Sequence, residues 1–208
     1  MKRSSIKRIL FFVFIISGCT LAAQTQLGMK LAPVVVSNRA TNEAQSVEND
    51  GSALKFSIGL VVDKPISDSY FLSSGLIYVP KRLAFRTDSA TSEEYTVQYL
   101  QIPLSLKLFA NEVAPDIKPY FQIGAGLEIK VFDEPTDPDY VVVEKFNPID
   151  FSVLIGAGVE YRAGINTTLF AGISYHRGLV NAVNETIAGA DDLQLRNTVF
   201  SIDFGVKF

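Results

Sequence analysis

The chain has 208 residues, a formal net charge of −3 and a single cysteine. The mildly acidic balance offers no basic footprint for nucleic acid, and one cysteine excludes a disulfide framework and a cysteine-based metal site. Hydrophobic residues make up 48% of the sequence. Even so, no apolar run after Ile16 approaches the ~20 residues of a transmembrane helix.

The N-terminus has the pattern of a bacterial export signal. An apolar run, Ile9–Ile16, follows a basic stretch (Lys2, Arg3, Lys7, Arg8) and precedes small and polar residues up to Ala23. The run is too short to span a bilayer and has the length of a secretory apolar region. We predict a signal peptide at residues 1–23 and one mature domain at residues 24–208. The segment Ile16-Ser17-Gly18-Cys19 also fits a lipobox, so lipidation of Cys19 is an alternative.

Eight segments of the mature chain alternate between apolar and polar residues. This period of two indicates strands with one apolar and one polar face. The segments are Gln26–Val36, Leu54–Asp63, Tyr70–Lys81, Tyr99–Leu108, Phe121–Lys130, Asp150–Arg162, Thr167–His176 and Thr198–Phe208. Most have the ~10 residues of a tilted transmembrane strand.

The links between these segments alternate between long and shorter. The long ones are Ser37–Ser52, Arg82–Glu94, Val131–Asn147 and Arg177–Leu195. Long loops on one side and tight turns on the other are typical of outer-membrane barrels. The sequence therefore predicts an all-β fold, an eight-stranded antiparallel up-and-down transmembrane barrel in the bacterial outer membrane. Its last strand should pair with its first, and Phe208 should act as the assembly signal read by the barrel-assembly machinery.

The polar faces of the segments carry charges of both signs in near balance. The lumen of an eight-stranded barrel is just wide enough for side chains to fill, and buried charges must pair. We therefore predict a lumen ion-pair network that plugs the barrel. Its expected members are Lys30, Lys55, Lys107, Lys130, Arg162 and Lys207 with Asp63, Glu128, Asp150, Glu160 and Asp203. The lumen-facing glycines should make room for long side chains opposite them.

Four patterns suggest sharper chemistry, and none is specific. Two Gly-Ala-Gly segments lie inside alternating strands with no helix after them, so they do not predict a phosphate site. Each extends to the five-residue pattern Gly-Ala-Gly-x-Glu, which ends at Glu128 and Glu160. These two carboxylates should stand roughly 20 Å apart along the barrel, too far for a glycosidase pair. His176, together with Asp191 and Asp192 in the next link, could suggest a hydrolase site at the outer rim of the barrel. One histidine and two loop carboxylates are not a specific signal for it. The acidic stretch 133–139 lacks the ligand spacing of a calcium loop. We predict no catalytic residue, cofactor or metal.

Several segments resemble the PorT-like outer-membrane β-barrel proteins of Bacteroidetes. The resemblance rests on Tyr99-Leu100-Gln101-Ile102-Pro103-Leu104, on Pro119-Tyr120-Phe121 followed by Gly124-Ala125-Gly126, on Ile155–Tyr161, and on Tyr175–Asn181. Pro103 falls on the polar face of its strand, where it should interrupt one ladder bond and favour a bulge. The resemblance implies an integral outer-membrane barrel without a defined catalytic set. Some members of that family are linked to type IX secretion and gliding machinery.

We therefore expect a non-enzymatic barrel with a structural or accessory role, a plugged lumen and long extracellular loops. Its expected partners are outer-membrane lipid, the barrel-assembly machinery during insertion, and envelope proteins reached through loops or periplasmic turns. Two alternatives remain open. One is a small-solute transport or ligand-binding barrel, and the other is a soluble lipocalin-like periplasmic barrel whose apolar face points inward.

Overall fold

The computed structural model describes residues 25–41, 47–49, 51–87, 92–135, 143–186 and 194–208. The signal-peptide and lipobox expectations, and Asp191 and Asp192, lie outside the described residues. The strands are β1 (Gln26–Thr41), β2 (Val47–Asn49), β3 (Ser52–Pro65), β4 (Tyr70–Thr87), β5 (Ser92–Phe109), β6 (Ile117–Pro135), β7 (Val143–Phe146), β8 (Ile149–Arg162), β9 (Thr168–Gly178), β10 (Val183–Thr186) and β11 (Gln194–Lys207). Among the described residues, no helix is long and apolar enough to cross a bilayer.

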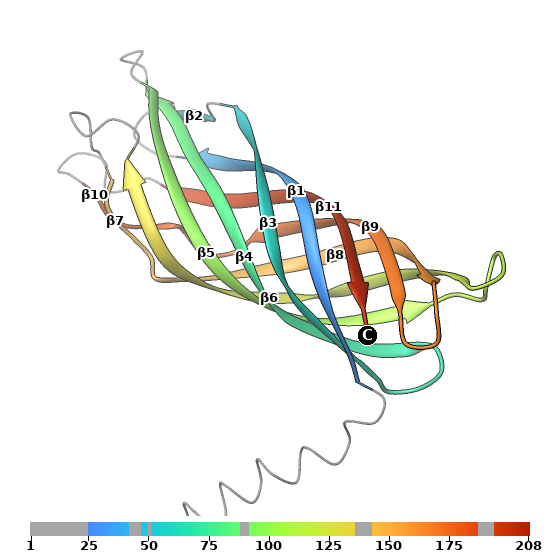
Figure 1. The fold of residues 1–208 in the computed structure, drawn as a ribbon. Helices are drawn as coiled ribbons and strands as arrows, with labels where there is room; N and C mark the ends of the chain where they lie inside the picture. The colour runs from blue at the N-terminus through green and yellow to red at the C-terminus, as the bar shows by residue number, and fades with distance from the viewer. Residues whose placement is uncertain (1–24, 42–46, 50, 88–91, 136–142, 187–193) are drawn as a thin grey trace, which may run out of the picture.

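Eight long strands form a closed antiparallel barrel, as the sequence predicts (Figure 1). Each long strand pairs with the next along the chain, and β11 returns to pair with β1 from Gly28↔Lys207 to Thr41↔Gln194. Closure leaves no free edge in the wall, which a lipid environment demands of a spanning sheet. The short strand β2 pairs with the end of β4, and β7 pairs with β10.

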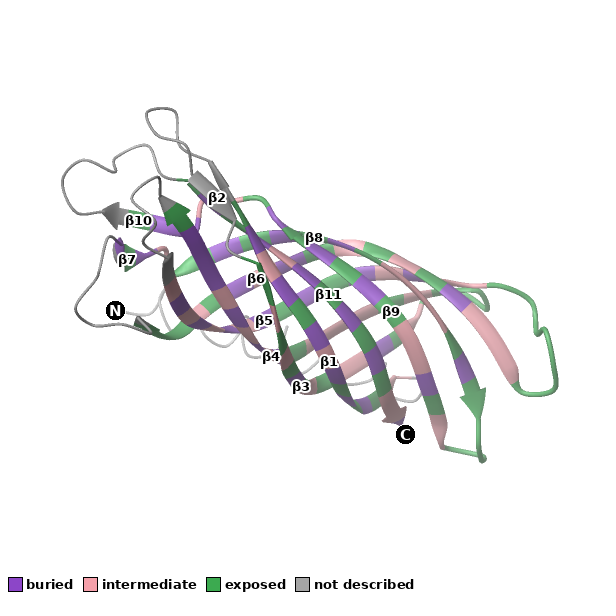
Figure 2. Ribbon diagram, turned by 90° about the horizontal axis from the view of Figure 1, so that it is seen from above, coloured by how far each residue is buried: buried purple, intermediate pink, exposed green. Residues whose placement is uncertain are grey.

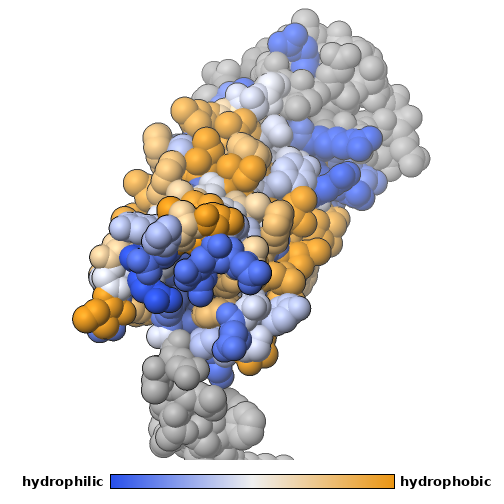
Figure 3. Space-filling view, turned by 90° about the vertical axis from the view of Figure 1, so that its right-hand side faces the viewer, coloured by the Kyte–Doolittle hydropathy of each residue, from blue (hydrophilic) through white to orange (hydrophobic). Residues whose placement is uncertain are grey.

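The apolar faces of the strands point outward. Leu54 and Phe56 on β3 are 65% and 61% exposed, whereas Ser57, on the opposite face of the strand, is buried. Buried and exposed residues alternate along the strands in the same way (Figure 2). On the face seen in Figure 3, apolar side chains cover much of the barrel wall, and hydrophilic ones gather at the end with the short turns. The inward-facing lipocalin-like alternative is therefore wrong.

The strands are longer than the sequence pattern predicts, and most of the extra length lies at the long-loop end. The predicted long link Arg82–Glu94 is mostly strand, because β4 continues to Thr87 and β5 begins at Ser92. In this part the alternation is inverted. Leu83 and Tyr95 are buried inside, while Arg82 and Glu94 form an ion pair of 2.7 Å on the outside. This end lies beyond the apolar belt, the part of the wall whose outward-facing side chains are apolar. Its outer surface meets water, so its apolar residues face inward, as in a soluble β-protein.

The predicted bulge at Pro103 is absent. Pro103 pairs in regular register with Gly126 of β6, and the register shift between these strands falls between Gln98 and Tyr99. On the other side, the β4–β5 ladder is interrupted around Pro103, where the Ser74 hydroxyl donates a hydrogen bond of 2.8 Å to the Pro103 carbonyl. The Ser74 hydroxyl thus satisfies the Pro103 carbonyl at the point where the backbone ladder between β4 and β5 is interrupted.

Candidate functional site: the filled lumen

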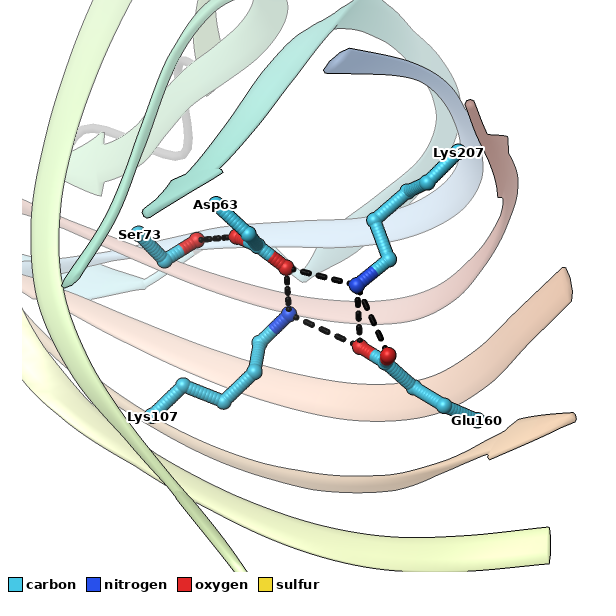
Figure 4. A network of polar contacts seen from close by, with 5 residues as sticks. All are labelled: Asp63, Ser73, Lys107, Glu160 and Lys207. Carbon is cyan, nitrogen blue, oxygen red and sulfur yellow. Dashed lines mark hydrogen bonds and ion pairs between the residues drawn. The ribbon is translucent and has the colours of Figure 1, made fainter. Parts of the chain in front are cut away.

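A cluster of four charged side chains crosses the lumen near the short turns (Figure 4). Lys207 Nζ lies 2.8 Å from Asp63 Oδ2 and 2.7 Å from Glu160 Oε2. Lys107 Nζ lies 2.7 Å and 3.2 Å from the same two carboxylates. The four residues come from β11, β3, β8 and β5, so the cluster ties opposite walls of the barrel together. Two cations and two anions balance, and the Ser73 hydroxyl donates a further hydrogen bond of 2.6 Å to Asp63.

A second group of polar side chains occupies the middle of the lumen. Lys30 Nζ lies 2.9 Å from Asp203 Oδ1. The hydroxyls of Ser201 and Ser174 donate to Asp203 at 2.7 Å and 2.9 Å. His176 lies beside them, with Nε2 at 3.2 Å from the Ser174 hydroxyl. The buried carboxylate thus has a cation and two hydroxyl donors, which offset the cost of its desolvation.

The third group lies farther toward the long-loop end and is centred on Glu128. Its carboxylate pairs with Lys81 and accepts hydrogen bonds from Gln101 at 2.7 Å and from Ser152 at 3.0 Å. Lys81 Nζ also lies 3.8 Å from Asp150 Oδ2. Gln101 Nε2 stands 3.3 Å from His176 Nδ1, which connects this group to the middle one. Polar contacts therefore run through much of the lumen.

An apolar cluster fills the barrel at the long-loop end. It contains Leu83, Phe85, Tyr95, Val97, Tyr99, Val143, Phe146, Ala182, Val183 and Leu195. Tyr95 and Phe146 pack edge to face with ring centroids 5.1 Å apart, and the Tyr95 hydroxyl accepts a hydrogen bond from the Val143 amide at 3.1 Å. Strands β7 and β10 contribute to this cluster, so residues beyond the eight barrel strands help to fill its opening.

Aromatic rings opposite glycines complete the filling. A Cβ at Gly158 would stand 2.6 Å from the Tyr120 hydroxyl, and a Cβ at Gly172 would stand 2.8 Å from it. Tyr120 can lie against these strands only because glycines are present, which is the role the sequence suggests. The lumen cavity beside Tyr120 and His176 measures about 40 Å³. That is room for roughly one water molecule and no organic solute.

The expected lumen residues divide into two groups. Eight of them make the contacts above or lie in those clusters: Lys30, Asp63, Lys107, Glu128, Asp150, Glu160, Asp203 and Lys207. Lys130 instead pairs with Asp133 at 2.8 Å outside the central clusters. Within the described part of the chain, Lys55 and Arg162 have no ion pair, and Arg162 is exposed at the short-turn end.

One charged member was missing from the sequence prediction. Lys81 lies on the polar face of its segment and is buried against Glu128. Lys81 shares the polar face of the predicted segment Tyr70–Lys81 with Ser73 and Gly75, and that shared face is the signal that points to it. Phe208 is exposed, and its backbone exchanges two hydrogen bonds with Leu27, at 2.8 Å and 3.2 Å. Its role in assembly stays a prediction.

The structure separates the residues that suggested catalysis. Glu160 is opposite Lys118 on β6, ten residues from Glu128 on that strand. This corresponds to about 33 Å along the strand. His176 is buried in the middle group and not at the rim. Among the described residues, no group of three or more His, Cys, Asp or Glu side chains could hold a metal ion.

Comparison with known proteins gives the family. The model of the outer membrane protein beta-barrel domain matches residues 21–184. The chain belongs to this family. It is an outer-membrane β-barrel protein, and the bacterial outer membrane is its location. A comparison with curated proteins finds no match.

Several solved structures are similar to this outer-membrane barrel. OprG from Pseudomonas aeruginosa is 12% identical with a TM-score of 0.58, over 89% of this chain and 96% of OprG. Neisserial surface protein A is 15% identical with a TM-score of 0.45, over 86% and 97%. The outer membrane protease OmpT from Escherichia coli is 8% identical with a TM-score of 0.45, over 89% and 96%. At these identities the likeness to OprG shows the fold, and fold alone does not assign an activity.

Proposed function

We propose that this protein is a non-enzymatic outer-membrane barrel with a plugged lumen, which serves as a structural or accessory component of the envelope. The observation that carries the proposal is the filled lumen. Buried charges pair with one another from the short-turn end to the middle, and an apolar cluster fills the other end. A transport barrel would need a continuous polar passage instead.

The chemistry of the lumen also favours a structural role. A general acid or base must reach its substrate within hydrogen-bond distance. His176, the one histidine, is buried with Ser174 and Gln101 at its two ring nitrogens. The carboxylates of Asp63 and Glu160 are held by two lysines. These groups tie strands together, and the lumen cavity that Lys107 and His176 line is only about 40 Å³, too small for an organic substrate.

The short turns supply a surface for an accessory role. Each of the three carries an exposed aliphatic side chain: Ile66, Val113 and Ile165, the last being 99% exposed. Short turns of such barrels face the periplasm. These side chains support the proposal that the partners are envelope proteins on the periplasmic side. By its resemblance to PorT-like proteins, a link to secretion or gliding machinery belongs to this proposal.

Conductance tests the plugged lumen. The protein, folded and reconstituted in a planar bilayer, should show no stable open state, with insertion verified by its heat-modifiable mobility on a gel. A stable, large conductance from heat-modifiable protein would overturn the proposal and favour the transport alternative.

Site-specific photo-crosslinking in native membranes tests the accessory role. A crosslinker at Ile165 should give a discrete protein adduct, and one at Leu104 on the apolar wall, the matched control, should label lipid only. Lipid labelling at both positions would contradict a periplasmic protein partner.

A further inference from the structure

Three arginines stand outside the barrel at the long-loop end, on neighbouring strands. Arg39 of β1 is directly opposite Arg196 of β11, and Arg177 of β9 is opposite Thr198 of β11. All three arginines are exposed. Like charges in directly opposite positions destabilise a sheet unless something compensates them. The pair Arg39–Arg196 therefore points to an anion supplied from outside the strand pair.

Several other cations of this protein pair with acidic side chains, whereas these three arginines have no acidic partner among the described residues. Arg82 lies on the outer surface at the same end and pairs with Glu94 at 2.7 Å. By contrast, no ion pair joins Arg39, Arg177 or Arg196 to any of the residues described by the structure. The only described polar contact of their guanidinium groups is from Arg196 to the Gln194 side chain at 3.5 Å. The charge of these three residues is uncompensated by described neighbours.

The arginines line a surface groove. Its lining residues are Arg39, Tyr175, Arg177, Gln194, Arg196 and Thr198, and its volume is about 440 Å³. None of them is acidic. Guanidinium groups bind phosphate through paired, charge-assisted hydrogen bonds, and a tyrosine hydroxyl can donate a further one. A concave site with three guanidinium groups fits one or two phosphate groups on a sugar.

The position of the groove relative to the apolar belt identifies the source of the phosphate. Val35, Phe200 and Tyr175 form one rung across the three strands, and all are partly exposed on the outer face. Arg177 lies one outward position above this rung, and Arg39 with Arg196 lies two above. Two outward positions span four residues, which is about 10 Å of height in strands tilted by about 40°. The guanidinium groups thus lie at headgroup level while acyl chains would cover the rungs below.

We propose that the groove formed by Arg39, Arg177 and Arg196 binds the phosphorylated sugar headgroup of an outer-leaflet glycolipid of the lipid A type. The phosphates sit among the guanidinium groups, and the acyl chains lie along the apolar wall of β1, β11 and β9. The site depends on the orientation of the barrel in the membrane and not on the plugged lumen.

The test uses the full mature barrel, refolded in detergent, and three probes. These are bisphosphorylated lipid A, the same lipid after removal of its phosphates, and inorganic phosphate. The triple variant Arg39→Gln/Arg177→Gln/Arg196→Gln should bind bisphosphorylated lipid A about 100-fold more weakly, since each cation near a membrane surface is worth roughly a factor of five. Dephosphorylated lipid and inorganic phosphate should bind weakly to both proteins.

Two further variants keep the test sharp. Arg82→Gln removes an outer arginine at the same end that already has an acidic partner, and it should leave lipid A binding unchanged. The charge-retaining triple lysine variant should lose only part of the affinity, because ammonium groups lack the paired donors of guanidinium. It also provides a folded comparison if the glutamine variant does not show heat-modifiable mobility.

The proposal is overturned by unchanged lipid A binding in the triple variant that folds. It is equally overturned if dephosphorylated lipid binds as tightly as lipid A, or if inorganic phosphate alone binds as tightly to the parent protein. The first result would mean that the arginines do not bind the lipid. The second would mean that the phosphates do not contribute to binding, and the third that the lipid does not.

Discussion

Lys207 is the cation whose loss should affect the barrel most. Its Nζ atom contacts Asp63 Oδ2 at 2.8 Å and both oxygens of Glu160 at 2.7 Å, with the side chain only 1% exposed. In Lys207→Met the two carboxylates keep Lys107 alone between them, so one negative charge stays uncompensated. Breaking a buried ion pair costs about 3–5 kcal/mol. Because Lys107 still contacts both carboxylates, we expect a loss near the lower end, about 3 kcal/mol of unfolding free energy.

The assay is urea unfolding of the barrel in lipid vesicles, followed by the difference in gel mobility between folded and unfolded protein. Adding Glu160→Gln to Lys207→Met restores the balance of one cation and one anion. The double variant should therefore be more stable than the sum of the two single losses by about 1–3 kcal/mol. Lys64→Met, an exposed lysine at the same end of the barrel, is the matched control and should stay within about 0.5 kcal/mol of the parent. A Lys207→Met protein as stable as the control, or additive losses in the double variant, would refute the reasoning.

Three other outcomes follow from the packing of the lumen and the end of the chain. Gly158→Ala places a Cβ 2.6 Å from the Tyr120 hydroxyl and should cost about 1–3 kcal/mol in urea unfolding. The control Gly164→Ala, whose Cβ would meet Thr167 at an ordinary contact distance of 3.8 Å, should cost little. Phe146→Ala empties the apolar cluster at the long-loop end and should cost about 3–5 kcal/mol, with faster proteolysis there as the second readout. Deleting Phe208 should lower the amount of heat-modifiable barrel in the outer membrane more than it lowers synthesis, and equal assembly would remove Phe208 as a signal.

The sequence predicts the strands correctly where they cross the membrane, because there their outward-facing side chains must be apolar. On β3 the side chains of Leu54, Phe56 and Ile58 face outward because lipid surrounds this part of the wall. The same alternation continues past Lys81 into Leu83 and Phe85 of β4. There its sense is inverted, since the outer surface meets water and the apolar residues form an inner cluster. A prediction that requires apolar residues on the outer face ends the strand where this inversion begins. It therefore assigns the rest of the strand, beyond Lys81 in β4, to a loop.

For the charged residues of the lumen, the sequence predicts the group of residues but not the individual ion pairs. Sequence alternation places Asp63, Lys107, Glu160 and Lys207 on inward faces, but it does not say which charge meets which. The partners of Lys207 are 144 and 47 positions away in the chain. Their meeting depends on the tilt and the closure of the barrel, which bring distant rungs to the same height.

By itself, the sequence determined the fold class, the compartment and the inward face of the charged residues, because a period of two and alternating link lengths are local properties that the bilayer enforces. Only the tertiary structure decided the specific ion pairs, the apolar filling of the outer opening and the alignment of Arg39, Arg177 and Arg196 on neighbouring strands. These features depend on the register between strands that are distant in the chain. Register is set by closure of the whole barrel and leaves no mark on any single segment.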